Sequence, residues 1–328
     1  EISACLVGSE MCIRDSANTL SQMEELVVQN YNHPSIVCWG LSNEITAATP
    51  VDEDLLENHR LLNDLCHKLD KTRFTTMANV FMQETDSPLL EIPDVNSYNL
   101  YFGWYLGELE QNDEFFDEYH AKYPDRCIGF SEYGADANPQ YQSTAPTHGD
   151  YSETYQTVYH EHMLKMIEER PYLWATHVWN MFDFACPMWE RGGVPARNMK
   201  GLVTFDRKTL KDSYFWYKAN WSKNPVLYLT QRRNNQRETR TTSVTVYSNL
   251  GTPKVFLNGK ALDNIRKGYT EVHYIIDNVT LANGENKLQA VITDRDGKEY
   301  ADEIIWHYQG EQRRSTDNRE NRNEHSGF

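Results

Sequence analysis

The chain has 328 residues, of which 39% are hydrophobic and 24% charged, and its formal net charge is −16. This composition excludes a collagen-like, coiled-coil or wholly disordered chain, and the length is enough for about two domains. A charge of this sign repels nucleic acid and anionic membranes, which favours a neutral or sugar-like partner over either of them. No apolar run is long enough to span a bilayer.

Residues 1–16 do not share the pattern of the chain that follows. The segment CLVGSEMCIRDS has neither a helix nor a strand period and resembles translated adaptor sequence, so we expect a non-native leader. The true start would then lie upstream, and the chain would be a truncated fragment. The apolar run 2–7 lacks the basic flank of a signal peptide, which leaves the compartment, periplasm or cytoplasm, open.

The cysteines are predicted to be free thiols. They are widely spaced and form neither a CxxC pair nor a Cys/His ligand set, and a chain of this length does not depend on disulfides. The six are Cys5, Cys12, Cys38, Cys66, Cys127 and Cys186.

Helix and strand patterns alternate from residue 17. Apolar residues recur at helical spacing from Leu20 to Tyr31, and the pre-proline restriction at His33-Pro34 ends this predicted helix. The run 36–41 is apolar on both faces, as in a buried parallel strand. Residues 52–69 predict a second helix, because acidic side chains occupy its first turn and leucines share one face.

Four more strands are expected, at residues 74–78, 95–101, 127–131 and 175–182. A further helix lies between the last two, with Asp150 and Glu153 placed as a capping box. The residues predicted to share its buried face are Tyr155, Val158, His162 and Ile167. Five short apolar strands alternating with helices favour an α/β barrel or a doubly wound sheet.

The pattern changes to period 2 after about residue 222. Runs at 243–247, 254–257, 272–276 and 287–292 are separated by Asn258-Gly259, Asn283-Gly284 and Asp296-Gly297, which supply the positive φ of tight hairpins. These features predict an antiparallel β-sandwich over residues 223–308, after an α/β unit over 17–222. Residues 309–328 are charged and nearly free of apolar side chains, so we expect a disordered tail.

Two acidic residues stand at the carboxyl ends of predicted strands. Glu44 follows the strand that ends in LSN, and Glu132 follows GFS. In a βα barrel this rim carries catalysis, because side chains from different strands converge there. A carboxylate pair suits a retaining glycosidase, in which one group cycles as acid and base and the other attacks the anomeric carbon. Salt-bridge or loop residues fit the same positions.

The segments NYNHPSIVCWGLSNE and GFSEYG resemble the two signature motifs of glycoside hydrolase family 2. The resemblance runs from about Leu26 to Tyr308. It implies an α/β fold, a partial TIM (β/α)8 barrel with about strands 4–8, followed by an immunoglobulin-like antiparallel β-sandwich. It also implies Glu44 as the general acid/base and Glu132 as the nucleophile of a hydrolase that acts through a covalent glycosyl-enzyme.

Three more residues take roles from the same resemblance. Asn43 corresponds to the residue that hydrogen-bonds the sugar 2-hydroxyl, although a turn residue is the simpler alternative. Tyr101, in NLYFGWY, would donate to the nucleophile and stabilise its charge, or would belong to the core. Trp179, in HVWNMFDF, matches the aromatic platform under the sugar, since C–H faces of sugars pack on indole.

The segment after the last barrel strand bears on the substrate. The stretch ARNMKGLVTFDRKTLKDSYFWYKANWS and the appended sandwich resemble β-galactosidases of the family, so a terminal β-galactoside is the favoured expectation. Asn198 and Lys200 fit the Asn-x-Lys pattern with which β-glucuronidases hold the substrate carboxylate, and a β-glucuronidase or other uronidase is the alternative. Lys200 as a solvated loop charge, and the whole chain as an inactive fragment or a non-catalytic carbohydrate-binding protein, also stay open.

No metal site is predicted from the residues. His160 and His162 are two apart on a helix and diverge, and His33 is interpreted as structural. No cofactor is required by the sequence, while Mg²⁺ or Na⁺ in a full-length parent stays open, as does a homo-oligomer of that parent. The expected partner is a carbohydrate, with neither nucleic acid nor a membrane.

Overall fold

A computed structural model describes residues 16–310, and within it the chain divides into two units. The first unit holds residues 16–141 and 146–214, and the second holds residues 142–145 and 215–310. Of the expected leader, only Ser16 lies in the described chain. The expected tail lies outside it from residue 311 onward.

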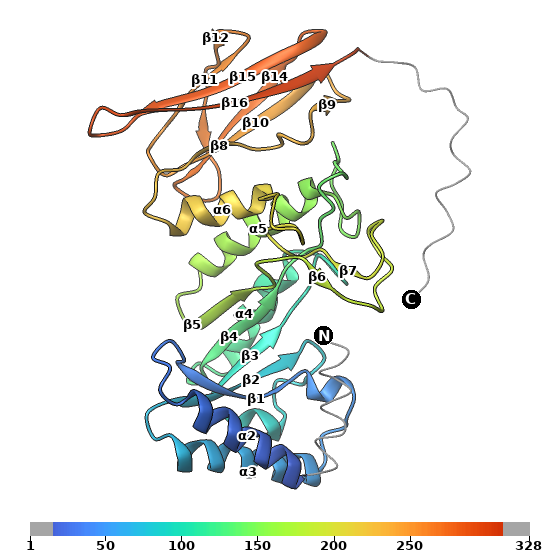
Figure 1. Cartoon of the computed structure of the whole chain (residues 1–328), viewed down its shortest axis with the longest axis vertical. Coiled ribbons are helices and arrows are strands. Elements are labelled where there is room, and N and C mark those ends of the chain that lie inside the picture. Colours follow the sequence, from blue (N-terminus) through green and yellow to red (C-terminus); the bar gives the residue numbers. More distant parts are fainter. Residues whose placement is uncertain (1–15, 311–328) are drawn as a thin grey trace. The chain divides into compact units, whose positions relative to one another are not determined.

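The first unit is built on a five-stranded parallel sheet whose strands follow one another in chain order (Figure 1). This arrangement confirms the predicted α/β class and the five expected strands. The strands are β1 (Cys38–Asn43), β2 (Phe74–Val80), β3 (Val95–Asn99), β4 (Ile128–Tyr133) and β5 (Leu173–Val178). The ends of β1 and β5 differ from the predicted 36–41 and 175–182, because pairing with a neighbouring strand, and not apolar composition, sets where a strand begins and ends.

Two of the helices follow their predicted boundaries. The first is α2 (Ser16–Asn30), which ends before His33-Pro34, and the second is α3 (Glu53–Leu69). Asp52 caps α3 by accepting a hydrogen bond from Leu55 N at 2.9 Å. Side chains of α2, α3 and β1 then form one apolar cluster, which fixes β1 against the helices. Its buried members are Met23, Val27, Trp39, Leu41, Leu62 and Cys66.

The capping box predicted at Asp150 is wrong. Helix α5 (Glu153–Glu168) is capped by Ser152, whose hydroxyl accepts a hydrogen bond from Tyr155 N at 3.0 Å. Asp150 accepts from Thr147 N and Ser152 N, so its carboxylate closes the turn that precedes the helix.

The predicted buried face of α5 is also wrong in part. Val158 is 36% exposed, whereas Tyr159, His160 and Met163 are fully buried. The helix is covered on more than one side, so a single apolar stripe does not describe it.

Two helices were not predicted. They are α4 (Gln111–Lys122) and α6 (Asp212–Trp221). α4 buries Asn112, Phe116 and Tyr119 in place of leucines, within a strongly acidic segment that obscures the helical period. Short elements complete the unit: η1 (Ile45–Ala47), η2 (Pro88–Glu91) and the hairpin of β6 (Phe184–Ala185) with β7 (Arg197–Asn198).

The second unit contains two sheets around an apolar core, as predicted for a β-sandwich. The first sheet has the order β13-β14-β10-β8, and the second has the order β12-β11-β15-β16-β9. All pairs are antiparallel except β9 with β16. The strands are β8 (Leu227–Leu229), β9 (Gln236–Arg237), β10 (Thr241–Ser248), β11 (Lys254–Leu257), β12 (Lys260–Ala261), β13 (Arg266–Lys267), β14 (His273–Thr280), β15 (Gly284–Thr293) and β16 (Glu299–Tyr308).

Two of the three predicted hairpin turns are present. Asn258 and Gly259 both have positive φ and join β11 to β12, while Asp296-Gly297 lies between β15 and β16. The turn at Asn283-Gly284 is not a hairpin, because it connects β14 and β15, which belong to different sheets.

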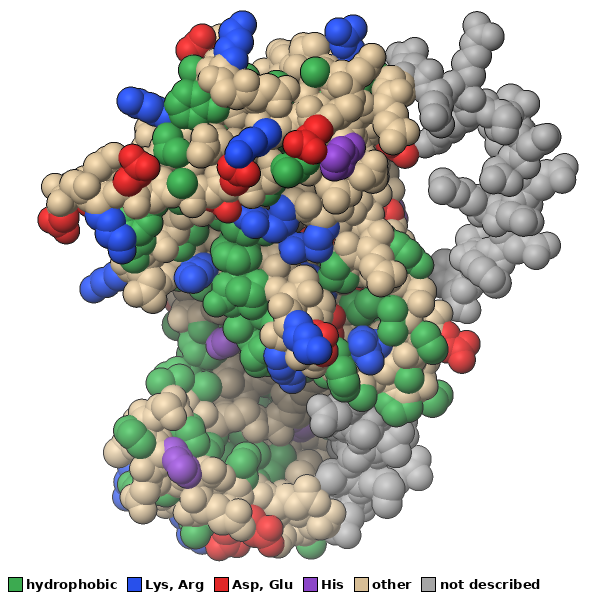
Figure 2. All heavy atoms as spheres, turned by 45° about the horizontal axis from the view of Figure 1, so that its top comes forward, with side chains coloured by type: hydrophobic (Ala, Val, Ile, Leu, Met, Phe, Trp, Pro, Cys, Tyr) green, Lys and Arg blue, Asp and Glu red, His purple; other side chains and the backbone are tan. Residues whose placement is uncertain are grey.

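Charged side chains of both signs lie on the surface. On the face seen in Figure 2, basic side chains are interspersed with acidic ones. Cys38, Cys66, Cys127 and Cys186 are free thiols, while the other two cysteines lie outside the described residues. Among residues 16–310, no helix is both long and apolar enough to cross a membrane.

Candidate active site

Glu44 and Glu132 lie at the same edge of the parallel sheet. Glu44 directly follows the last residue of β1, and Glu132 is the penultimate residue of β4. Because all five strands run in one direction, their carboxyl ends share this edge. Asn99, the last residue of β3, pairs in register with Glu132 and so joins the group.

The backbone of Glu44 turns sharply at the end of β1. Its φ of 49° and ψ of 30° are left-handed, an uncommon conformation for a residue with a side chain. Glu44 N donates to Ala78 O of β2 at 2.9 Å, and the short helix η1 begins at the next residue. The turn ends the strand and holds the carboxylate at the sheet edge.

Asn99 connects the two carboxylates. Its Nδ2 donates to Glu44 Oε1 at 3.0 Å and to Asn43 Oδ1 at 3.1 Å, and its side chain also hydrogen-bonds Glu132. Ser131 Oγ donates to Asn99 Oδ1 at 2.6 Å, which fixes the orientation of the amide. The predicted residues Asn43, Glu44 and Glu132 therefore belong to one hydrogen-bonded cluster.

Tyr101 contacts Glu132 directly. Its hydroxyl donates to Glu132 Oε2 at 2.7 Å, and burial raises the pKa of this phenol well above its usual value. The hydroxyl therefore keeps its proton and stabilises the ionised carboxylate.

Burial raises the pKa of both carboxyls. It brings the pKa of Glu132 to about 7. The hydrogen bond from Tyr101 and the charge of Lys200 oppose this rise, whereas the charge of Glu44 adds to it. Burial also raises the pKa of Glu44, against the hydrogen bond from Asn99. Two carboxyls that repel each other lose their protons in separate steps, so one proton stays near neutral pH. Tyr101 and Lys200 favour the ionised form of Glu132.

Lys200 is buried beside this cluster and is not a solvated loop charge. Its Nζ lies 2.7 Å from Asp136 Oδ2 and donates to the hydroxyl of Tyr105. The ammonium also lies 5.0 Å from the ring centre of Trp189 and 5.6 Å from that of Tyr101. The ammonium therefore lies on the Glu132 side of the site and next to the rings of Trp189 and Tyr101, which form its aromatic wall.

Asn198 and Asp136 shape the loop that carries Lys200. Asn198 Oδ1 accepts from Lys200 N at 3.0 Å, and Asp136 Oδ1 accepts from Met199 N at 2.8 Å. Trp104 Nε1 donates to Asp136 Oδ2 at 3.0 Å, so three donors hold the buried carboxylate. The side chain of Lys200 is thereby held by Asp136, in the segment after β4, while Asn198 fixes the backbone of its own loop.

A second buried ion pair supports the same loop. Lys211 Nζ lies 3.0 Å from Asp183 Oδ1 and donates to Ala137 O and Met199 O, each at 2.8 Å. Ala137 follows Asp136, and Met199 precedes Lys200. This ammonium therefore ties together the two segments that carry the Lys200–Asp136 pair.

Trp179 follows β5 and approaches the end of β4. Its backbone N–H donates to Tyr133 O at 2.8 Å, and its ring meets Phe184 edge to face. A Cβ at Gly134 would lie 2.0 Å from Trp179 O, so only glycine allows this close approach. Trp179 Nε1 is buried without a hydrogen-bond partner among residues 16–310, and this leaves an indole donor for a ligand.

Metal-ligating residues do not cluster in the described chain. No group of three or more His, Cys, Asp or Glu side chains there has the geometry to hold a metal ion. His162 pairs with Asp113 at 2.7 Å, and burial lowers the pKa of His160 to about 3.

Three residues of the site were missed from the sequence: Asn99, Tyr105 and Asp136. The predicted strand 95–101 ran past Asn99 and hid its position at a strand end. Asp136 is an acid four residues beyond Glu132, a signal that was available, while Tyr105 was one aromatic residue among many.

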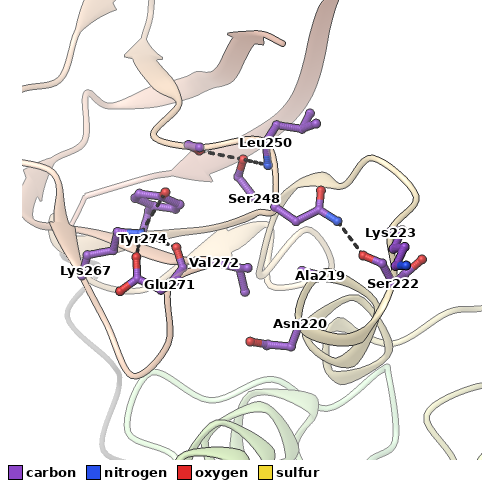
Figure 3. Close-up of a pocket in the computed structure, with 12 residues that line it drawn as sticks. Ala219, Asn220, Ser222, Lys223, Ser248, Leu250, Lys267, Glu271, Val272 and Tyr274 are labelled. Carbon is purple, nitrogen blue, oxygen red and sulfur yellow. Dashed lines mark hydrogen bonds and ion pairs between the residues drawn. The ribbon is translucent and has the colours of Figure 1, made fainter. Parts of the chain in front are cut away.

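A separate hollow lies in the second unit. A cavity of about 590 Å³ lies between the end of α6, the loop 248–251 and the β13–β14 turn (Figure 3). Its polar groups bond to one another: Lys267 Nζ meets Glu271 and Tyr274, and Ser248 Oγ donates to Gly251 O. Because these groups already have hydrogen-bond partners within the protein, we assign no ligand to the hollow.

Comparison with known proteins adds a family match. The model described as "Glycosyl hydrolases family 2, TIM barrel domain" matches residues 13–226, which include both carboxylates and the Lys200 loop. The parallel sheet is thus the predicted part of a TIM barrel.

Similar proteins carry two activity names. A β-glucuronidase of Bacteroides fragilis is 37% identical over 297 residues, 89% of this chain and 41% of that protein. A Bacteroides fragilis structure named a "putative beta-galactosidase" is 51% identical with a TM-score of 0.86, covering 90% of this chain and 44% of that one. An FMN-binding β-glucuronidase from Faecalibacterium prausnitzii L2-6 is 44% identical with a TM-score of 0.84, at the same coverage. The chain spans less than half the length of each.

Proposed function

The chain belongs to glycosyl hydrolase family 2, and on that premise we propose that it supplies both catalytic carboxylates of a retaining β-glycosidase. The observation that carries the proposal is the cluster in which Asn99 hydrogen-bonds Glu44 and Glu132 while Tyr101 donates to Glu132. One carboxylate is stabilised as an anion and the other retains the proton, which is the division of roles that double displacement needs.

The two steps follow from this division. Ionised Glu132 attacks the anomeric carbon, and Glu44 gives its proton to the glycosidic oxygen as the carbon–oxygen bond breaks. The sugar is then an ester of Glu132, and Glu44 is a carboxylate. Glu44 next takes a proton from water, whose oxygen attacks the anomeric carbon, and Glu132 leaves as a carboxylate. The enzyme returns to its starting protonation.

The substrate we favour is a terminal β-glucuronide. Lys200 is a buried cation next to the aromatic wall and close enough to Glu132 to lower its pKa, so a carboxylate on the bound sugar would meet a compensating charge. Two similar proteins are named β-glucuronidases.

A terminal β-galactoside is the second candidate. Asp136 already neutralises Lys200 at 2.7 Å, so the site does not depend on an anionic substrate, and the 51% identical structure carries the galactosidase name. The sequence alone favoured this candidate.

The test compares matched fluorogenic substrates on the protein that contains this chain. Methylumbelliferyl β-glucuronide should be hydrolysed with a kcat/KM at least about tenfold above that of the β-galactoside, a difference of about 1.4 kcal/mol. A reversed preference selects the galactoside. Glu132→Gln should abolish both reactions, and full activity of this variant would refute the assignment of the nucleophile.

A further inference from the structure

Strand β1 contains one extra residue just before the acid/base. Gly40 pairs with Thr76 of β2, but Asn43 pairs with Ala78, so three steps along β1 match two along β2. This is a β-bulge, which bends a strand and changes which face the following side chains occupy.

The bulge turns Asn43 to the catalytic face. Trp39 and Leu41 pack against α2 and α3, and strict alternation would point Asn43 to that same helix layer. Asn43 Oδ1 is instead bonded to Asn99 Nδ2, in the cluster with Glu44. The extra residue is therefore required for the site as it stands.

Ser42 occupies the helix-facing side of the bulge, where His59 of α3 holds it. The two are joined by a 2.9 Å hydrogen bond between Ser42 Oγ and His59 Nε2. His59 Nδ1 lies 2.9 Å from Leu55 O, an acceptor, so Nδ1 carries the proton and Nε2 accepts from the Ser42 hydroxyl. His59 is 1% exposed, and burial lowers its pKa, which keeps the ring neutral.

We propose that His59 is a positioning residue for the acid/base: it anchors Ser42 in the helix layer, which keeps the bulge that presents Asn43 and Glu44 to Glu132. The proposal rests on the function proposed for Glu44. Loss of either partner leaves the buried His59 acceptor or the part-buried Ser42 hydroxyl without its hydrogen bond. A shift of β1 by one residue would remove that cost, but it would also turn Asn43 away from the catalytic face.

Leaving-group dependence of the first step tests this role. A dinitrophenolate leaves without a proton, whereas a phenolate needs Glu44, so kcat/KM for dinitrophenyl and phenyl glycosides separates general-acid loss from loss of folded protein. His59→Leu and Ser42→Ala should lower kcat/KM for the phenyl glycoside about tenfold or more, and for the dinitrophenyl glycoside by less than about threefold. Equal losses for the two substrates would overturn the proposal.

Matched variants complete the design. His67→Leu makes the same change on α3 at a 39% exposed side chain and should change neither rate. His59→Gln retains an acceptor for Ser42 and should restore most of the phenyl glycoside activity. Glu44→Gln must show the leaving-group dependence itself. If Glu44→Gln lacks this dependence, the proposed function fails. If Glu44→Gln shows the dependence and His59→Leu does not, only the positioning role is refuted.

A structural readout is independent of turnover. A crystal structure of the His59→Leu protein should show regular pairing of β1 with β2, or Asn43 separated from Asn99. An intact bulge with the Asn43–Asn99 bond retained would refute the role of His59, whatever the activity.

Discussion

Tyr101 donates its hydroxyl hydrogen to Glu132 Oε2 at 2.7 Å; the phenol is buried and the carboxylate is partly buried. Burial by itself would favour the neutral carboxylic acid, as the pKa of about 7 at Glu132 indicates. The phenol works against burial because it stabilises the anion in the position from which we propose that it attacks.

Removing this phenol should slow the first step. Tyr101→Phe leaves the ring and removes one hydrogen bond to a charged group, worth about 1.5–3 kcal/mol, so kcat/KM should fall about 10- to 150-fold. Steady-state kinetics with a dinitrophenyl glycoside measure the effect. Tyr172→Phe, which removes a hydroxyl bonded to Asp117, serves as the control, and an unchanged rate in Tyr101→Phe would show that Glu132 does not need this donor.

The shared proton predicts a bell-shaped dependence of kcat/KM on pH. The rate falls on the acidic side where both carboxyls carry a proton, and on the alkaline side where both are ionised. Burial raises the pKa of both groups, that of Glu132 to about 7, so the bell should lie above the usual carboxyl value of 4.5.

Single variants should move the acidic limb. Tyr101→Phe and Lys200→Ala each remove a group that lowers the pKa of Glu132, so the limb moves to higher pH. Profiles with a dinitrophenyl glycoside measure the shifts, and a limb that stays in place or moves to lower pH in either variant would contradict the role of that group.

The family motifs located the carboxylates because each carboxylate belongs to a short sequence motif at the end of a strand. The contacts among the side chains could not be predicted in the same way. Asn99 acts through bonds to residues on β1 and β4, and Asp136 acts through Lys200, 64 residues further along the chain. Such roles depend on strand register, which composition does not encode.

The fold shows the same division. Apolar runs predicted all five parallel strands, because such runs are typical of the strands of parallel sheets. The bulge in β1 was invisible, because Ser42 and Asn43 are both polar and alternation gives no sign of the extra residue. The acidic helix α4 was missed because its buried face is aromatic and amide in composition.

Lys200 should discriminate between the substrates. Lys200→Ala removes the cation proposed to meet the glucuronide carboxylate, so kcat/KM for the glucuronide should fall about a hundredfold or more. The galactoside should lose much less, through the raised pKa of Glu132. Lys208→Ala, at an exposed lysine of the following loop, is the control, and equal losses on both sugars would argue against a carboxylate clamp.

The Lys211–Asp183 pair should matter chiefly for stability. Lys211→Met leaves a buried carboxylate without its cation and removes the Lys211 donor from Ala137 O and Met199 O, so the free energy of unfolding should fall by about 3–5 kcal/mol. Urea unfolding of the protein that contains this chain measures the loss. Lys165→Met, at an exposed pair with Glu169 of 3.5 Å, should cost less than about 1 kcal/mol.

The loss in Lys211→Met should also depend on pH. Burial raises the pKa of Asp183, and Lys211 opposes that rise, so removing the lysine raises the folded-state pKa further above the unfolded value of 3.8. The folded variant then binds more protons than the unfolded chain, and its stability falls as pH rises from 3.8 through the folded-state pKa. The deficit relative to the unmodified protein should therefore be smallest in acid and largest near neutral pH. Asp183→Asn in the same chain should remove most of this dependence, and a deficit that stays constant with pH would show that Asp183 is not the uncompensated charge.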